Sequence, residues 1–407
     1  MGQQANLPGG PGGSKERSVP PGAPTSSPSE ARVAERAEAK PSTNRVGGPG
    51  GQDGLNPDDP GVRLLAEAAK GMEASALLLV HCGDLPGLAP GATRLILDVR
   101  ERTGSPHRCV SDLGRTDTSA PLPVGDARFE AAMVWPRAHL GKDFSESCLA
   151  VGALALREGG HLLCAVRKQK GGKSLGKIMR ALLGDDAVEV VARERGYHLW
   201  KGVRGPDIDT ELATELSTRH YEIHDEALGD LRLRSQPGVF SRRELDGGTR
   251  ALLHVTDELL RRDAETGRPA PRAVLDLCAG VGTLGLWAAQ RLEQAEVIAV
   301  ESNLRACALI RENAERNGFA SRVQVHEHDG LPAEITPVDL VLLNPPTHAD
   351  VDTLRRLFDL RAWLRPGGQV LLVVSRPHRA LQLLTELGAE VDGGERDGYF
   401  VLRARWN

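Results

Sequence analysis

The feature that most constrains the fold of this 407-residue chain is a pattern that occurs twice, once in each half. Three pairs of segments match in the same order and at similar offsets. They are 129–136 (FEAAMVWP) with 338–345 (VDLVLLNP), 156–166 (LREGGHLLCAV) with 364–374 (LRPGGQVLLVV), and Gly196-Tyr197 with Gly398-Tyr399. Such self-similarity indicates an internal duplication. The chain is therefore expected to contain one architecture twice, so differences between the copies are informative about function.

Apolar runs of strand length alternate with helix-like stretches in both halves. In the first half the runs are 76–81, 95–99, 131–135, 161–166 and 188–191, with helix-like stretches at 145–156 and 174–183. In the second half the runs are 273–277, 296–301, 323–326, 340–343 and 369–374, with helix-like stretches at 283–292, 304–317 and 351–364. This alternation predicts an α/β fold in each half, with a parallel sheet covered by helices on both faces.

The composition divides the chain into three parts. Residues 1–60 hold eleven Gly, ten Pro and no aromatic residue. Such a segment buries too little apolar surface to offset the entropy of ordering, so it is predicted to be a disordered tail. It is either a solubilising extension or a tether. The predicted domains that follow are 61–205, the first half, and 206–407, the second half.

Several classes of protein are excluded by the sequence. No stretch approaches the roughly 18 consecutive apolar residues that a membrane span needs, and no apolar run follows Met1. The six cysteines are scattered singly, which argues against a disulfide framework and against a zinc site. We therefore expect a cytoplasmic protein with no membrane association and no metal.

The strand predicted at 273–277 leads through a glycine-containing turn into a helix. A site for a dinucleotide would carry the pattern G-x-G-x-x-G, whose helix N-terminus binds a pyrophosphate. Here only Gly280 and Gly282 follow the strand, and an acid, Asp276, lies near the end of the strand. Glycines let the backbone approach a ligand, while a carboxylate favours positive charge. The pattern predicts a cofactor that has a cationic amino group and no phosphate.

Polar residues also end the next three predicted strands. Glu301 follows Asp276 by 25 residues, a place from which it could accept hydrogen bonds from both hydroxyls of a ribose. Asp329 follows the third strand and could accept from an adenine amino group. The fourth strand ends in Asn344, Pro345 and Pro346.

Taken in this order, D-x-x-x-G-x-G, the two strand-end acids and Asn-Pro-Pro resemble the class I S-adenosylmethionine-dependent methyltransferases over about residues 220–407. A fold for another adenosine cofactor and a catalytically inactive copy remain alternatives. The segment 237–253 (PGVFSRRELDGGTRALL) resembles the small-subunit ribosomal RNA guanine-N2 methyltransferase C family, of the "methyltransferase small domain" type. This second resemblance covers about residues 65–407. It implies two tandem Rossmann-like methyltransferase domains, an N-terminal degenerate one and a C-terminal catalytic one.

The resemblance also implies a site and a cofactor, S-adenosyl-L-methionine. The cofactor-binding residues would be Asp276, Cys278, Gly280, Gly282, Glu301, Asp329 and Asn344, and the catalytic residues Asn344, Pro345 and Pro346. Asn-Pro-Pro marks methyltransferases that act on a planar nitrogen. The Asn oxygen and the carbonyl before the two prolines can accept the hydrogens of an amine, and the prolines fix this backbone. The protein then mainly has to align the amine with the methyl group.

The substrate contacts are less clearly marked. Family members usually carry an aromatic residue after the two prolines, whereas this chain has Thr347 and then His348. The ring of His348 or of Phe240 could replace it, although Phe240 could equally pack in the core. By the same analogy residues 246–249 would lie near the methionine end of the donor. Arg242 could bind an RNA phosphate or simply face solvent.

The first half has the sequence of a degenerate partner. Val80 stands where Asp276 is expected, and Trp135, Pro136 and Arg137 replace Asn-Pro-Pro. Residues 61–205 carry 21 basic and 16 acidic side chains, a net +5, whereas residues 206–407 carry 24 and 32, a net −8. A cluster without intervening acids comprises Arg167, Lys168, Lys170, Lys173, Lys177 and Arg180. It is either a solvated face or a surface that binds RNA phosphates.

These observations predict an enzyme that methylates the exocyclic amine of a guanine in ribosomal RNA. The expected partner is ribosomal RNA or the small ribosomal subunit, and the expected oligomeric state is a monomer. Two alternatives stay open. One is a methyltransferase for a protein amide or a small molecule, and the other is a non-catalytic RNA-binding homologue.

Overall fold

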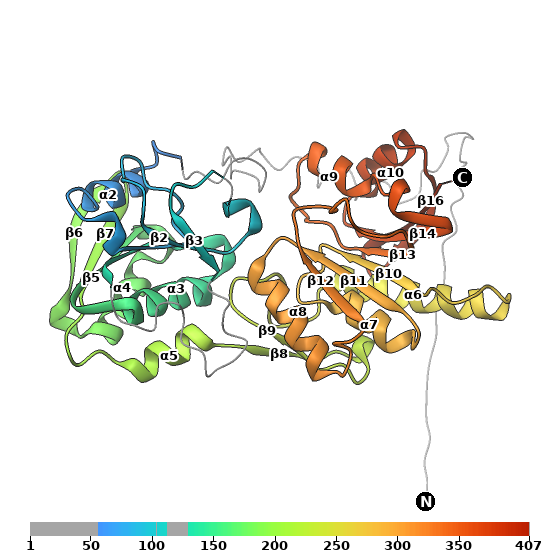
Figure 1. The fold of residues 1–407 in the computed structure, drawn as a ribbon, viewed down its shortest axis with the longest axis horizontal. Helices are drawn as coiled ribbons and strands as arrows, with labels where there is room; N and C mark the ends of the chain where they lie inside the picture. The colour runs from blue at the N-terminus through green and yellow to red at the C-terminus, as the bar shows by residue number, and fades with distance from the viewer. Residues whose placement is uncertain (1–55, 103, 112–128, 407) are drawn as a thin grey trace, which may run out of the picture. The chain divides into compact units, whose positions relative to one another are not determined.

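The computed structural model describes residues 56–102, 104–111 and 129–406. The predicted disordered tail, residues 1–60, lies outside the described residues except for its last five positions. Two seven-stranded sheets dominate the described chain, one in each half (Figure 1). No helix in the described ranges has the length and apolar character needed to cross a membrane.

The two sheets have the same strand order, which confirms two tandem copies of one architecture. The first sheet runs β3 (Arg108–Ser111), β2 (Thr93–Ile96), β1 (Leu77–Val80), β4 (Phe129–Val134), β5 (Leu156–Arg167), β7 (Tyr197–Val203) and β6 (Val188–Glu194). The second runs β12 (Val323–Glu327), β11 (Glu296–Glu301), β10 (Ala273–Leu277), β13 (Val338–Leu343), β14 (Leu364–Val374), β16 (Tyr399–Arg405) and β15 (Glu390–Arg396).

The prediction of purely parallel sheets is wrong at one edge of each sheet. Strand β7 pairs antiparallel with β5 and β6, and β16 pairs antiparallel with β14 and β15. The cause lies in two tight turns. Arg195 and Gly196 both have positive φ, and so do Asp397 and Gly398. Two successive residues with positive φ are typical of a two-residue hairpin turn, which joins antiparallel strands without a crossover helix.

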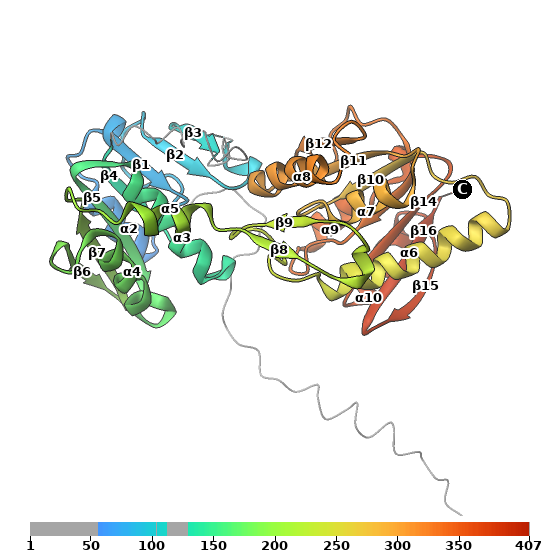
Figure 2. The same ribbon diagram turned by 90° about the horizontal axis from the view of Figure 1, so that it is seen from below.

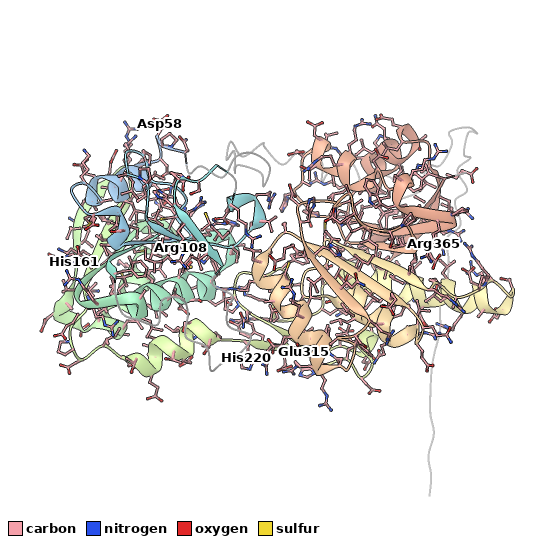
Figure 3. All side chains as sticks on the ribbon, in the orientation of Figure 1. Asp58, Arg108, His161, His220, Glu315 and Arg365 are labelled. Atoms are coloured by element: carbon pink, nitrogen blue, oxygen red, sulfur yellow. The ribbon has the colours of Figure 1, made fainter. Side chains whose placement is uncertain are left out.

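Helices cover both faces of each sheet, as predicted. In the first half they are α2 (Pro60–Ala68), α3 (Lys142–Ala155), α4 (Lys173–Leu183) and α5 (Thr210–Thr218). In the second half they are α6 (Gly247–Glu265), α7 (Thr283–Arg291), α8 (Leu304–Arg316), α9 (Val351–Phe358) and α10 (Pro377–Glu386). Helices α6, α7 and α8 pack with one face of the second sheet, and α9 and α10 with the other. The labelled Arg108 and His161 mark the first sheet in Figure 3, and Arg365 marks the second.

The chain leaves the first half later than the predicted boundary at residues 205 and 206. Helix α5 still packs on the first half, because Ala213 and Leu216 are buried in its core together with residues of α3 and α4. A short hairpin follows, formed by β8 (Tyr221–Ile223) and β9 (Leu233–Ser235), and leads toward α6 (Figure 2). The segment 237–253, which resembles the methyltransferase family, begins just after this hairpin and includes the start of α6.

Candidate active site

The first element of the site is Asp276, on the central strand β10. Its side chain is fully buried, and its Oδ2 accepts a hydrogen bond of 2.7 Å from the backbone N–H of Gly285 in α7. Its Oδ1 is buried without a hydrogen-bond partner among the described residues. Burial raises the pKa of Asp276 from 3.8 to about 7, and the nearby Glu301 adds to this rise. A buried carboxylate oxygen without a partner is unusual in a folded protein and is a feature of ligand sites.

The turn after β10 has a strained backbone. Cys278, Gly280 and Gly282 all have positive φ, and Gly282 caps α7. A Cβ added to Gly280 would meet nothing within 4 Å, so this backbone is open to a ligand. At Gly282, where φ is positive, a Cβ would lie 3.1 Å from the Ile310 side chain, so another residue would be both strained and crowded. Cys278 is not glycine yet lies in the left-handed region, a conformation that clusters at functional sites.

Glu301, at the end of β11, is bound to this turn. Its Oε2 accepts a hydrogen bond of 2.8 Å from the N–H of Gly280, and its Oε1 accepts one of 2.8 Å from the N–H of Asn303. Burial raises the pKa of Glu301, whereas these backbone donors lower it. Each carboxylate oxygen can accept a further hydrogen bond. Glu301 is thus fixed in place with acceptor capacity left for a ligand.

Asp329 lies at the start of the loop after β12, the neighbour of β11 in the sheet. Its carboxylate is half-buried and lies 3.7 Å from the guanidinium of Arg356. It contributes to the rise in the pKa of Cys278, which is mainly due to burial of the thiol. The predicted adenine-binding acid is therefore close to the same turn as Asp276 and Glu301.

Asn344 follows β13 on the other side of β10. Its Nδ2 donates to Asp246 Oδ2 at 3.0 Å and to Thr249 Oγ1 at 2.9 Å. Asp246 is itself fixed, because it caps α6 and accepts a hydrogen bond of 2.9 Å from the N–H of Thr249. Both hydrogens of the Asn344 amide are thereby used. The side-chain oxygen of Asn344 is the atom that remains to accept from a substrate.

A pocket joins the turn after β10 to Asn344. Its lining includes residues of that turn, Cys278 and Gly280, and residues before or within α6, among them Phe240, Glu244, Asp246 and Thr249. Phe240 is 62 % exposed, so it is a surface residue at the pocket and the alternative of core packing is wrong.

Other predicted site residues have different surroundings. Arg242 donates from Nε to Asp143 Oδ2 of α3 at 2.6 Å, so its charge is paired within the protein. Pro345 is buried, whereas Pro346, Thr347 and His348 are exposed beside it. Arg167, Lys168, Lys170 and Lys173 are exposed at the end of β5 and at the start of α4, in the first half. They do not line the pocket.

Several residues that line the pocket were not predicted as site residues, among them Ile223 and Glu244. Ile223 belongs to β8, a strand of three residues that carries no periodic pattern. The link between Asp246 and Asn344 was missed as well, since 98 positions separate them in the sequence. A signal for it was present in Asp246 as a helix N-cap before a long amphipathic stretch.

At the corresponding edge, the described strands of the first half carry apolar residues in place of Asp276 and Glu301. Val80 pairs with Val134 at the place where Leu277 pairs with Leu343 in the second sheet, so Val80 is the counterpart of Leu277. The residue before it, Leu79, is therefore the counterpart of Asp276. Val80 also pairs with Leu95 as Leu277 pairs with Val300, which makes Ile96 the counterpart of Glu301. Leu79 is buried in an apolar core, so the assignment of a degenerate site holds although the predicted position was shifted by one residue.

Charged residues of the first half are paired with each other near its own turn. Arg94 and Glu101 are 2 % and 1 % exposed, and their side chains lie 3.4 Å apart. Arg94 also binds Asp84 at 3.1 Å, and Arg137 binds Glu101 at 2.8 Å. The opposite charges of this network compensate each other, although Arg94 Nε is buried without a hydrogen-bond partner among the described residues.

Comparisons with known proteins point to a family of methyltransferases. The family described as "Methyltransferase small domain" matches residues 230–403. A ribosomal RNA small subunit methyltransferase C of Hahella chejuensis is 31 % identical over 265 residues, which are 64 % of this chain and 72 % of that protein. The protein of the same name from Pseudomonas syringae pv. tomato is 29 % identical over 340 residues, 81 % of this chain and 93 % of that protein.

A solved structure is similar over nearly the whole described chain. It is the T. thermophilus 16S rRNA N2 methyltransferase in complex with AdoMet and guanosine. The TM-score is 0.70 at 27 % identity, with coverage of 86 % of this chain and 92 % of the other. The tandem folds, the strand-end acids of the second copy and these relatives lead to one assignment. The chain belongs to the ribosomal RNA small subunit methyltransferase C family.

Proposed function

We propose that this protein transfers a methyl group from S-adenosyl-L-methionine to the exocyclic amine of a guanine in small-subunit ribosomal RNA. The observation that carries the proposal is the orientation of Asn344. Asp246 and Thr249 accept from its amide nitrogen, which leaves Oδ1 as its acceptor, and Asn344 lines the pocket that also contains the turn after β10. The relatives named above support the choice of ribosomal RNA as substrate.

The residues present fit the proposed cofactor. Asp276 offers a buried oxygen without a partner, and Gly280 offers open backbone. Cys278 and Gly282 shape the turn, Glu301 would accept from the ribose hydroxyls, and Asp329 would accept from the adenine amine. When bound, S-adenosylmethionine supplies an electrophilic sulfonium methyl group. The protein therefore needs no metal for this chemistry, and its task is to bind and align the two reactants.

Asn344 would hold the target amine. Its Oδ1 accepts one hydrogen of the amine, and the backbone carbonyl before Pro345 can accept the other. These contacts orient the nitrogen lone pair and increase its electron density. Pro345 and Pro346 restrict the backbone at this point, because a proline ring fixes φ. Asp246 and Thr249 keep the Asn344 amide from rotating, which would otherwise present its N–H groups to the amine.

Phe240 would provide the aromatic surface that the Thr347 position lacks. Its ring is 62 % exposed in the lining of the pocket that contains Asn344. An exposed phenylalanine is available for stacking on a base, and such stacking contributes about 1–3 kcal/mol. His348 is exposed next to Thr347 but does not line the pocket, so Phe240 is the better candidate.

The basic cluster of the first half would bind the RNA backbone. Arg167, Lys168, Lys170 and Lys173 are exposed, and the guanidinium of Arg167 lies 5.0 Å from the centre of the Tyr197 ring. Phosphate binding by such residues is largely independent of base sequence. Because the second half carries a net −8, RNA affinity would come mainly from the first half, with the protein acting as a monomer.

The test is transfer of tritium from labelled donor to RNA. Small-subunit RNA and assembled small subunits are prepared from a strain that lacks the gene and from its parent strain. We expect label in guanine N2 of RNA from the deletion strain and none in RNA from the parent strain, which is already methylated. Label in protein would favour an amide substrate. Donor binding without any transfer would favour a non-catalytic homologue.

A further inference from the structure

Corresponding loops of the two halves pair with each other beside the proposed cofactor site. The strand registers make residues 97–99, after β2, the counterparts of residues 302–304, after β11. The N–H of Val99 donates to the carbonyl of Ser302 at 2.9 Å, and the N–H of Leu304 donates to the carbonyl of Leu97 at 2.8 Å. These two hydrogen bonds are therefore reciprocal. Val99 binds Ser302, the counterpart of Leu97. Leu304, the counterpart of Val99, binds Leu97.

The side chain of Asp98 reinforces this pairing. Its Oδ2 accepts a hydrogen bond of 2.9 Å from the hydroxyl of Ser302. Arg100 holds the same carboxylate from the other side, with Nε to Oδ1 at 2.7 Å and Nη2 to Oδ2 at 2.7 Å. A carboxylate bound at both oxygens by one guanidinium has a fixed orientation. Asp98 can thus act as a rigid support for Ser302.

The segment that Asp98 supports carries Glu301. Ser302 follows Glu301 directly, and the N–H of Asn303 donates to Glu301 Oε1. The other oxygen of Glu301 accepts from Gly280, in the turn that contains the open backbone. Ser302 and Leu304 are therefore attached to the first half, and Asn303 between them forms an antiparallel bridge with Asp98.

We propose that the first half completes the cofactor site of the second, with Asp98 as a positioning residue for Glu301. This inference rests on the proposed function. A loop that is already held in its binding conformation does not have to be ordered when the ligand binds, so affinity rises without any direct contact. The first half lacks its own counterparts of Asp276 and Glu301, yet it would determine how tightly the donor is bound.

The test is the affinity for S-adenosylhomocysteine, an unreactive relative of the donor, measured by calorimetry on the full chain. We expect Asp98→Ala and Ser302→Ala to raise Kd about tenfold, which corresponds to about 1.4 kcal/mol. At saturating donor both variants should keep kcat within about twofold, since Asp98 does not touch the amine site. Asp98→Asn retains an oxygen for the Ser302 hydroxyl and should restore most of the affinity.

Arg102→Ala is the matched control. It removes an exposed ion pair between the halves, from Arg102 Nη2 to Glu327 Oε2 at 3.1 Å, and should leave Kd unchanged. A double-mutant cycle adds a second control, because Asp98→Ala should have no further effect once Glu301→Ala has removed the group that it positions. Ser302→Ala keeps the pair of Asp98 and Arg100 intact, so it remains informative if Asp98→Ala unfolds.

The outcomes separate this inference from the proposed function. If the wild-type chain binds S-adenosylhomocysteine and Ser302→Ala and Asp98→Ala bind it as Arg102→Ala does, the positioning role is refuted and the proposed function stands. An additive effect of Asp98→Ala in the Glu301→Ala background would also refute it. If the wild-type chain binds no S-adenosylhomocysteine, the proposed function fails and the inference fails with it.

Discussion

The two halves of this protein share a strand order but differ at the carboxyl ends of their central strands. In the second half these ends carry Asp276 and Glu301, and in the first half Leu79 and Ile96 occupy the same places. Buried charge is present in both halves, but its partners differ. Arg94 and Glu101 of the first half bind each other, whereas Asp276 keeps an oxygen without a partner among the described residues. The same fold can therefore carry a candidate binding site where a buried carboxylate, such as that of Asp276, keeps an oxygen available for a ligand.

The largest loss of stability is expected from breaking the buried ion pairs of Glu101 with Arg94 and Arg137 in the first half. Glu101→Ala would remove the buried carboxylate that pairs with both Arg94 and Arg137, and breaking a buried ion pair typically lowers the free energy of unfolding by about 3–5 kcal/mol. Chemical denaturation of the full chain, followed by a probe in the first half, measures this. The comparison predicts that the second half unfolds as in wild type. Loss of stability in both halves alike would show that the network is not local to the first.

Asn344→Ala should separate binding from turnover. We expect kcat to fall by at least about 100-fold, because the amine loses the group that orients it. Calorimetry with S-adenosylhomocysteine should give an unchanged Kd, since the proposed cofactor contacts at Gly280 and Glu301 remain. Normal turnover by this variant would contradict the assignment of Asn344.

Asp276→Asn tests whether the unsatisfied carboxylate lowers stability. Its folded pKa, about 7, lies above its ordinary value of 3.8, so the folded protein holds a proton that the unfolded chain has lost between these values. Stability therefore falls as the pH rises from about 4 to about 7, and the penalty is complete above that. Three pKa units limit it to about 4 kcal/mol. Thermal unfolding should show Asp276→Asn stabilised over wild type at about pH 8 and much less at about pH 5.

A gain that is equal at both pH values would show that Asp276 is not a titrating group in this range. Leu79→Asp offers the reverse comparison in the first half. It buries a carboxyl group with no donor placed for it, and it should destabilise the protein more at about pH 8 than at about pH 5.

The smallest effect is expected at the rim of the pocket. Phe240→Ala should raise KM for RNA about 5- to 150-fold, which corresponds to about 1–3 kcal/mol of lost stacking, and Phe240→Tyr should retain most of the affinity. Steady-state kinetics with small-subunit RNA at saturating donor measures both. Because Phe240 is 62 % exposed, folding stability should not change. An equal KM for all three proteins would remove Phe240 from the substrate site.

The sequence predicted local elements better than contacts between them. Strands 273–277 and 296–301 were predicted with the bounds of β10 and β11, because fully buried strands form short continuous apolar runs. Strands β7 and β16 were missed, since their alternating polar residues and hairpin turns do not stand out in composition. The helix-like stretch 351–364 was predicted too long, because α9 ends at Phe358 and the chain enters β14 at Leu364.

In the site too, residues next to strand ends were easier to predict than contacts between distant elements. Asp276, Glu301 and Asn344 could be predicted because each is adjacent to a strand end, and the ends of parallel strands meet at one edge of a sheet. The hydrogen bonds from Asn344 to Asp246 and Thr249 could not, because α6 reaches this edge only through the tertiary fold. Arg242 could not be assigned either, since its partner Asp143 belongs to the other half of the chain.

The reciprocal hydrogen bonds of Val99 and Leu304 have a consequence for how such a chain evolves. Equivalent positions that contact each other are the signature of a two-fold symmetric dimer. After fusion of the two genes, one copy can lose its ligand-binding groups and still be retained by selection, because the backbone of one of its loops supports the site of the other copy. Amino-acid changes should then be freer at Val99, which contributes its backbone N–H to this pairing, than at Asp98, whose side chain binds Ser302.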